Sequence, residues 1–251
     1  MDGWIDLYGT MANVRLDTKE EEEIEYHTDW KCPSTGSITW IWRHNNWKQL
    51  VQRVEDESDV SDIIKQLRAN HVIVNIAVDS IPSGGSNSAT LYEMSFQTNG
   101  YCVFATGSDL SNAFSWMFEI LGWPFQFIAS NFVVFGSGRI EIPAFKTPVP
   151  PPGETVTCLF AITVQNHTLD NSFVSMNYTI ESTDGSDIHE FPSTQTYPLY
   201  GTAQSTNLVL YGYLSYKWTI DYHYNTVAPQ IIECRMYSGI YHDFVPLPDF
   251  K

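Results

Sequence analysis

Apolar and polar residues alternate along much of the second half of the chain, with the period of two expected of half-buried β-strands. The longest example is residues 211–224, YGYLSYKWTIDYHY, whose even positions from 214 to 222 are aromatic or aliphatic. Residues 155–165 alternate as cleanly. Their shared face consists of Val156, Cys158, Phe160, Ile162 and Val164. We expect 211–224 to form one long ribbon whose aromatic face packs into a core.

Other segments share this extended character, with turn residues between them. They are residues 37–42, 71–80, 89–98, 101–106, 131–145, 172–180 and 230–250. The sequence predicts loops at 81–88 and 181–206, a turn at Asn99-Gly100 and a stiff proline-rich connection at 146–154.

Helical spacing of apolar residues predicts helices only in the first half of the chain. The predicted helices are residues 46–54, 58–70 and 108–122. Ser58 or Ser61 is the expected N-cap of the second helix, which Asn70 ends.

About eight strands after the first helical region, joined by long loops, predict a mainly β protein with an antiparallel jelly-roll sandwich. The expected organisation is an extended N-terminal arm over residues 1–36 and one jelly-roll domain over 37–251, with two short helical insertions. An immunoglobulin-like sandwich fits less well, because its strands are shorter and it needs no helices of this size.

The charge balance excludes several kinds of partner. The chain has 13 Lys and Arg against 29 Asp and Glu, a formal net charge of −16, without a basic stripe or arm. Strong direct binding to nucleic acid or to an anionic membrane surface is therefore not expected. The N-terminal residues have no basic region followed by an apolar one, and no apolar run is long enough to span a bilayer. These features predict a soluble protein made in a cytoplasm.

The four cysteines do not form a metal-binding pattern. Disulfides are one option, but Cys102, Cys158 and Cys234 each lie in a predicted strand, which favours free, buried thiols; Cys32 lies in the irregular N-terminal segment.

Motifs for catalysis are weak. In FGSGR, residues 135–139, a strand rather than a helix follows the glycines, so they indicate a bend and not a phosphate site. Ser238, His242 and Asp243 invite comparison with a nucleophile triad, but the chain has no GxSxG elbow. The seven histidines have no metal-ligand spacing. We expect no enzyme activity, cofactor or metal.

Two further features allow alternative interpretations. Asn166 and Asn177 begin N-x-T glycosylation sequences, which without a signal peptide are chance matches. The loop 189–198 fits either a binding loop or a polar crossover.

The order of the predicted elements resembles the capsid subunits of picorna-like viruses, including the dicistroviruses and iflaviruses. Residues 61–85 look like the family's first core helix and strand C, and 109–122 like the helix between strands D and E. Residues 127–142 are similar to strand E, although no Arg precedes Gly136. Residues 233–248 look like the last strand, with His242-Asp243-Phe244 where the family often has Asp-Asp-Phe.

The resemblance implies a coat protein that assembles with itself or with sister subunits into an icosahedral shell, located in the virion and, during assembly, in the host cytoplasm. It implies weak or indirect contact with packaged RNA, a host receptor and no membrane partner. Only Asp243 is carried over as a residue for maturation cleavage.

Three alternatives stay open. The first is a glycan- or receptor-binding sandwich of fibre or lectin type, using exposed aromatic residues among Trp30, Trp42, Trp47 and Trp123. The second is a crystalline occlusion-body matrix protein, and the third is a β-rich hydrolase that depends on one carboxylate.

Overall fold

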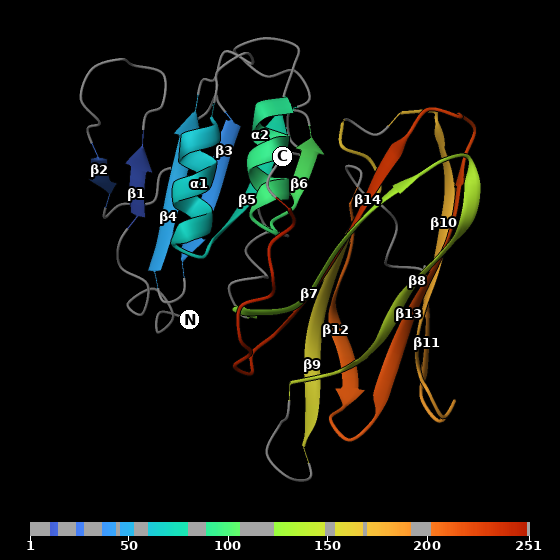
Figure 1. Cartoon of the computed structure of the whole chain (residues 1–251). Coiled ribbons are helices and arrows are strands. Elements are labelled where there is room, and N and C mark those ends of the chain that lie inside the picture. Colours follow the sequence, from blue (N-terminus) through green and yellow to red (C-terminus); the bar gives the residue numbers. More distant parts are fainter. Residues whose placement is uncertain are drawn as a thin grey trace. The chain divides into compact units, whose positions relative to one another are not determined.

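A computed structural model of the chain shows two compact units. One is Met1–Phe114 with Leu247–Lys251, and the other is Ser115–Pro246. The structure describes residues 11–14, 24–27, 37–43, 46–52, 60–79, 89–105, 123–148, 154–167, 170–191 and 202–249. Figure 1 shows the elements of both units.

The first unit contains two sheets. Strands β1 (Met11–Val14) and β2 (Ile24–His27) pair antiparallel. A four-stranded sheet has the order β4-β3-β5-β6. Its strands are β3 (Ser37–Arg43), β4 (Asn46–Gln52), β5 (Val72–Asp79) and β6 (Cys102–Ala105). The pair β5–β6 is parallel, whereas β3 pairs antiparallel with both β4 and β5.

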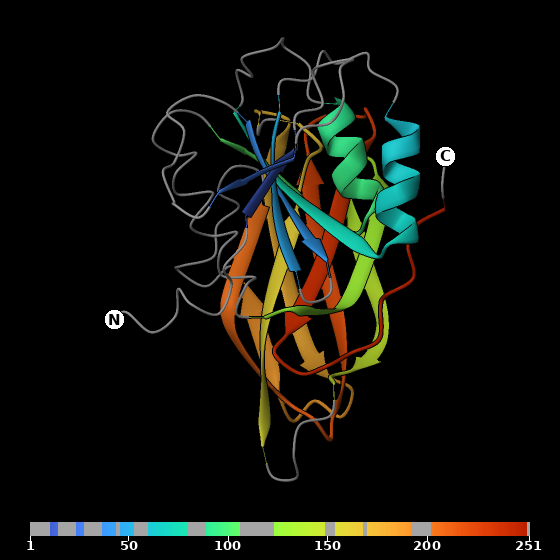
Figure 2. The same cartoon turned by 90° about the vertical axis from the view of Figure 1, so that its left-hand side faces the viewer.

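Two helices lie side by side against β5, namely α1 (Ser61–Ala69) and α2 (Ala89–Gln97) (Figure 2). Every residue of β5 from Val72 to Ala77 is buried. Such continuous burial, with Asn75 as its one polar residue, is typical of a strand that is covered on both faces and has a parallel neighbour.

Gly100 allows the close approach between the end of α2 and β5. A Cβ atom at this position would lie 1.9 Å from the carbonyl oxygen of Val74. Nearby, the Thr98 hydroxyl accepts the Val74 N–H (3.0 Å) and donates to the Met94 carbonyl (2.9 Å). Asn99 has a positive φ of 60° and ends the helical region.

The second unit consists of two antiparallel four-stranded sheets in a sandwich-like arrangement. One sheet has the order β12-β9-β14-β7 and the other β11-β10-β13-β8. The strands are β7 (Phe125–Val134), β8 (Ser137–Lys146), β9 (Thr155–Thr163), β10 (Phe173–Ser182), β11 (Ile188–Phe191), β12 (Thr202–Tyr211), β13 (Ser215–Tyr224) and β14 (Gln230–Ser238).

Aromatic side chains fill the centre of the sandwich. The ring of Phe160 on β9 contacts Trp218 on β13 and Tyr178 on β10 at centroid distances of 5.7 and 5.4 Å. Tyr178 stacks on Phe191 of β11 at 5.0 Å. The predicted inward faces are confirmed, because Val156, Cys158, Phe160, Ile162 and Val164 are all buried, as are Tyr216, Trp218 and Ile220.

The helix α1 and the strands at 37–43, 72–79 and 102–105 are confirmed, whereas two local predictions in the first unit are wrong. Residues 46–52 form strand β4 instead of a helix, because they pair with β3 along their whole length. Residues 89–97 form α2 instead of a strand, since the parallel pair β5–β6 requires a crossover connection. The N-cap of α1 is Val60 rather than a serine.

Two predictions in the second unit also need correction. The ribbon 211–224 is broken by a turn at residues 212–214, at which the chain passes from β12 in one sheet to β13 in the other. The loop predicted at 181–206 contains β11, which pairs with the end of β10. The helix predicted at 108–122 lies outside the described residues.

The strands of residues 37–105 do not join either sheet of the sandwich. β5, which the capsid resemblance equates with strand C of a jelly roll, pairs with β3 and β6. Within the segment predicted as an extended arm, β1 and β2 pair with each other. In the described part of the chain, no helix is long and apolar enough to cross a membrane.

Candidate functional site

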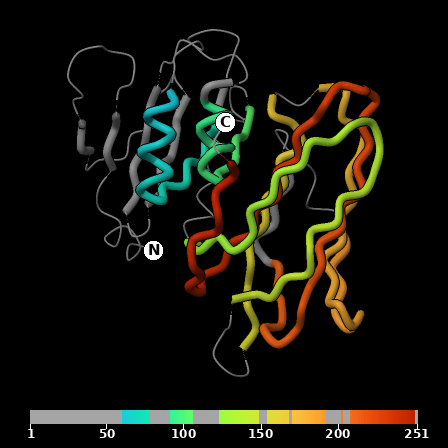
Figure 3. Tube along the Cα trace, in the orientation of Figure 1, coloured from blue at the N-terminus to red at the C-terminus, as the bar shows by residue number. Residues whose placement is uncertain are grey.

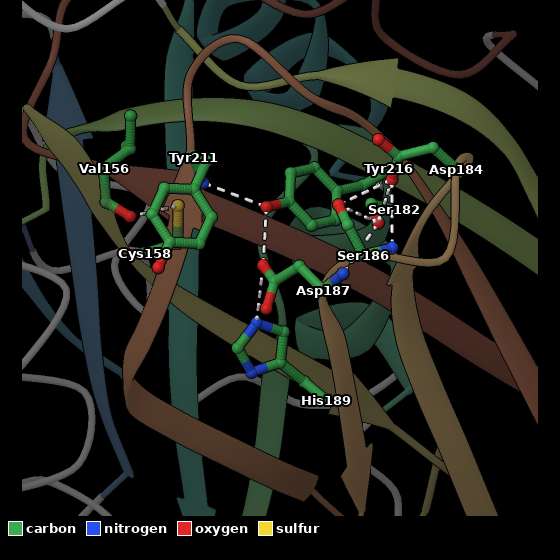
Figure 4. A network of polar contacts seen from close by, with 9 residues as sticks. All are labelled: Val156, Cys158, Ser182, Asp184, Ser186, Asp187, His189, Tyr211 and Tyr216. Atoms are coloured by element: carbon green, nitrogen blue, oxygen red, sulfur yellow. Dashed lines mark hydrogen bonds and ion pairs between the residues drawn. The ribbon is translucent and has the colours of Figure 1, made fainter. Parts of the chain in front are cut away.

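Two connections adjoin at one end of the sandwich, which we call the hairpin end after the antiparallel pair β10–β11. They are the β10–β11 turn, residues 183–187, and the β12–β13 turn, residues 212–214. The Thr183 N–H donates to the Ser215 carbonyl at 2.7 Å, which joins the two connections directly. Figure 4 shows the polar contacts at this end.

Asp184 fixes the shape of the β10–β11 turn. Its Oδ1 accepts hydrogen bonds from the Ser182 hydroxyl (2.8 Å), the Ser186 hydroxyl (2.7 Å) and the Ser186 N–H (3.0 Å). These bonds favour the charged form and lower the pKa of Asp184 to about 2, the Ser186 hydroxyl contributing most. Gly185 has a φ of +74°, which completes the tight turn.

A buried tyrosine connects this turn to the β12–β13 turn. The Tyr216 hydroxyl donates to Asp187 Oδ2 (2.6 Å) and accepts the Tyr211 N–H (2.9 Å). His189 Nε2 lies 3.2 Å from the same Asp187 oxygen. Burial, followed by the hydrogen bond to Asp187, raises the pKa of Tyr216, so this hydroxyl stays neutral.

Two tyrosines at the β12–β13 turn face solvent. Tyr213, in the turn, has 79% of its surface exposed, and Tyr211, the last residue of β12, has 40%. Their ring centroids are 5.6 Å apart with an interplanar angle of 42°. The rings therefore form a small aromatic surface at a turn whose backbone is held by Tyr216.

The contacts of this end suit binding better than catalysis. The hydroxyls of Ser182 and Ser186 bond to Asp184 rather than to His189, and the lowered pKa of Asp184 makes it a weak base for activating either one. The raised pKa makes Tyr216 a poor proton donor or nucleophile. Among the described residues, no group of three or more His, Cys, Asp or Glu side chains is placed to hold a metal ion.

The three residues compared with a nucleophile triad bond to backbone carbonyls or to a tyrosine hydroxyl. The Ser238 hydroxyl donates to the Ile240 carbonyl at 3.0 Å, and His242 Nδ1 lies 2.6 Å from the carbonyl oxygen of Asp243. Asp243, the residue considered for maturation cleavage, is exposed beyond β14. Its Oδ1 accepts the Tyr241 hydroxyl at 3.0 Å.

Of the tryptophans proposed for glycan binding, the structure describes the exposure of Trp123 alone. Trp123 is half-buried at the start of the sandwich. Trp42 and Trp47 are register partners in β3 and β4, and Trp30 lies outside the described residues. The exposed pair Tyr211 and Tyr213 was missed because both were assigned to one continuous strand; Gly212 between them was the available turn signal.

Other predictions from single motifs are confirmed. Gly136 has a φ of +53° at the turn between β7 and β8, as expected of a bend in the FGSGR segment. Cys102, Cys158 and Cys234 are free and buried, while Cys32 lies outside the described residues. Of the predicted loop 189–198, the first three residues belong to β11.

Residues 130–239 match a family model described as a domain of unknown function (DUF7154). The matched range runs from the last part of β7 to just beyond β14 and therefore contains the hairpin end. A comparison with curated proteins finds no significant match.

Proposed function

We propose that the second unit is a jelly-roll module that recognises glycans, without catalysis, through the exposed tyrosines of the hairpin end. The ligand that fits is a sugar ring with an apolar face and several hydroxyl groups. This proposal corresponds to the binding-module alternative of the sequence analysis, with Tyr211 and Tyr213 in place of the tryptophans.

The strand order supports a jelly roll. In one sheet the last strand, β14, lies between the first and third strands, β7 and β9. In the other, β13 lies between the second and fourth strands, β8 and β10. Such interleaving of early and late strands is what two Greek keys produce when they fold together.

The exposure of Tyr213 on a fixed turn is the observation that carries the binding proposal. A large aromatic ring held in solvent buries apolar area when a ligand stacks on it, and its two side-chain torsions cost little entropy to order. Tyr211 widens the surface, and the carboxylate of Asp184 at the same end can accept hydrogen bonds from sugar hydroxyls. A few fixed polar groups beside an aromatic surface are typical of small-molecule recognition.

The test is a glycan array probed with the full chain and with Tyr213→Ala. The wild type should bind a restricted set of glycans, and the alanine variant should lose that signal. Tyr213→Phe is the matched control, because it keeps the ring. An array that stays blank with wild-type protein, or equal binding by Tyr213→Ala, would rule the proposal out.

A capsid subunit is the second candidate, because the jelly-roll strand order favours it as well. It would assemble with copies of itself or sister subunits, in the virion and in the host cytoplasm. The placement of β5 outside the sandwich removes one segment on which the resemblance rested. Size exclusion and negative-stain electron microscopy on protein from its native source decide between the two: uniform shells support the capsid, and a monomer that binds glycans excludes it.

A further inference from the structure

The opposite end of the sandwich exposes three apolar side chains, which we call the apolar tip. Val133 and Phe135 flank the end of β7 and are 62% and 56% exposed, and Val227, between β13 and β14, is 89% exposed. The tip and the hairpin end are at opposite ends of β13, which runs from Ser215 to Tyr224.

Backbone hydrogen bonds hold the two turns of the apolar tip together. The Gly136 N–H donates to the Thr226 carbonyl (3.2 Å), and the Tyr224 N–H donates to the Gly136 carbonyl (2.8 Å). Figure 3 shows the turn after β7 beside the turn after β13. Phe135 and Val227 each adjoin one of these bonded residues, so their positions are set before any partner binds.

A third connection at this end restrains the tip further. The Asn225 N–H donates to the Ser172 carbonyl (2.8 Å). Buried Gln165 donates to the Ser172 hydroxyl (2.7 Å) and to Asp170 (3.1 Å), which holds residues 170–172 in place before β10. The tip is therefore a rigid support for exposed apolar groups, and these groups do not contribute to the core.

The tip is uncharged in a strongly acidic chain. Residues 131–138 and 224–232 contain no Asp, Glu, Lys, Arg or His, although the formal net charge is −16. The residues of these five types next to the two ranges are Arg139, His223 and the buried Glu233. On the third connection they are His167 and Asp170, whose Nδ1 and Oδ2 atoms are 3.8 Å apart. Burial of the tip in an apolar medium therefore desolvates no charge on its two turns.

We propose that the apolar tip inserts into the interface of a membrane of zwitterionic lipid. Three side chains offer much less than the roughly 800 Å² per partner that a stable protein–protein interface buries. A bilayer interface needs no matching pocket and accepts single apolar groups with uncharged surroundings. Because the chain is acidic, anionic lipid should repel it, so this proposal is compatible with the charge argument against anionic membranes.

The test is co-sedimentation of the full chain with vesicles of phosphatidylcholine, and with vesicles that also contain phosphatidylserine. The wild type should sediment with phosphatidylcholine, and phosphatidylserine should weaken binding. Val227→Ser and Phe135→Ser should each lower the partition coefficient about tenfold, as expected for the loss of one inserted apolar side chain.

Ile188→Ser is the matched control, because Ile188 is 53% exposed at the hairpin end, away from the apolar tip. It should bind vesicles like the wild type, and Tyr213→Ala should do the same, which separates this proposal from glycan recognition. Absence of wild-type binding, an equal loss in Ile188→Ser, or stronger binding to phosphatidylserine would overturn the proposal. So would a wild-type dimer that Val227→Ser dissociates, because the tip would then be a contact between copies.

Discussion

Replacement of Tyr216 by phenylalanine isolates the hydroxyl group that holds the hairpin end together. The side chain is fully buried, and its ring packs 6.2 Å from the ring of Phe145, a contact that phenylalanine keeps. The substitution therefore removes two hydrogen bonds, one to Asp187 and one from the Tyr211 N–H, with little change in packing.

The expected loss of unfolding free energy follows from the nature of the two hydrogen bonds. The bond to the Asp187 carboxylate is charge-assisted and contributes about 1.5–3 kcal/mol, and the bond from the Tyr211 N–H contributes about 0.5–1.5 kcal/mol. The Asp187 side chain retains 17% exposure, so water replaces part of the lost bond. We expect the free energy of unfolding to fall by about 2–4 kcal/mol.

Urea unfolding followed by the NMR signal of the indole N–H of Trp218, which lies in the sandwich core, measures this loss. Tyr213→Phe is the control: its hydroxyl belongs to a side chain that is 79% exposed, and its removal should change stability by less than about 0.5 kcal/mol. A loss of unfolding free energy below that limit for Tyr216→Phe would refute the claim that this hydroxyl supports the hairpin end.

The same variant makes a prediction about alkaline pH. The folded-state pKa of Tyr216 is raised, chiefly by burial, so folding favours the neutral form. This contribution is complete below the unfolded-state pKa of about 10 and is lost as the pH rises above it. The wild type should therefore lose stability more steeply above about pH 10 than Tyr216→Phe does.

Three further predictions follow from single positions. Gly100→Ala should destabilise the first unit by at least about 3 kcal/mol, because the new Cβ would collide with the Val74 carbonyl oxygen; thermal unfolding measures this, and a wild-type melting temperature would contradict it. In an NMR titration Asp184 should titrate near pH 2, and Ser186→Ala should raise this pKa; the stabilisation from Asp184 is present above about pH 4 and is lost as the pH falls towards 2. Burial raises the pKa of Cys158 to about 12, so iodoacetamide should modify it in urea but not in the native protein, as peptide mass mapping would show.

Alternation along the chain predicted the interior of the sandwich well, because burial in each strand follows a period of two. It did not predict where strands end, since Gly212 breaks a ribbon whose apolar pattern continues into β13. It also failed for α2, because a segment of nine residues fits the period of a helix as well as that of a strand. The helix is required by the parallel pairing of β5 with β6, which are distant in sequence.

The candidate site was harder to predict than the fold. Tyr216 and Asp187 are 29 residues apart in sequence, and their contact depends on the pairing of β10 with β13. The exposure of Tyr213 depends on the turn that separates β12 from β13. The Tyr216–Asp187 contact and the exposure of Tyr213 both follow from which strands pair and where each strand ends. The pattern of apolar and polar residues along the sequence does not contain this information.

The two sheets of the sandwich differ in the surface that they leave free, and this difference favours binding at the ends. Glu233, Arg235 and Tyr237 alternate with the core residues of β14, yet they are fully or almost fully buried, so the centre of that sheet is covered on both faces. The other sheet keeps an exposed outer face on which charged side chains pair across strands. Its ion pairs are Arg139–Asp221 (2.7 Å) and Lys217–Glu181 (2.6 Å).

Paired surface charges contribute little to stability, but a partner that covers them must remove their water. Neither sheet face therefore offers a favourable docking area, since one is covered at its centre and the other carries solvated ion pairs. Exposed aromatic and aliphatic side chains on rigid turns occur instead at the two ends, Tyr213 at one and Phe135 with Val227 at the other. Arg139→Ala should therefore leave both glycan and vesicle binding unchanged, whereas Tyr213→Ala should remove glycan binding and Val227→Ser should weaken vesicle binding.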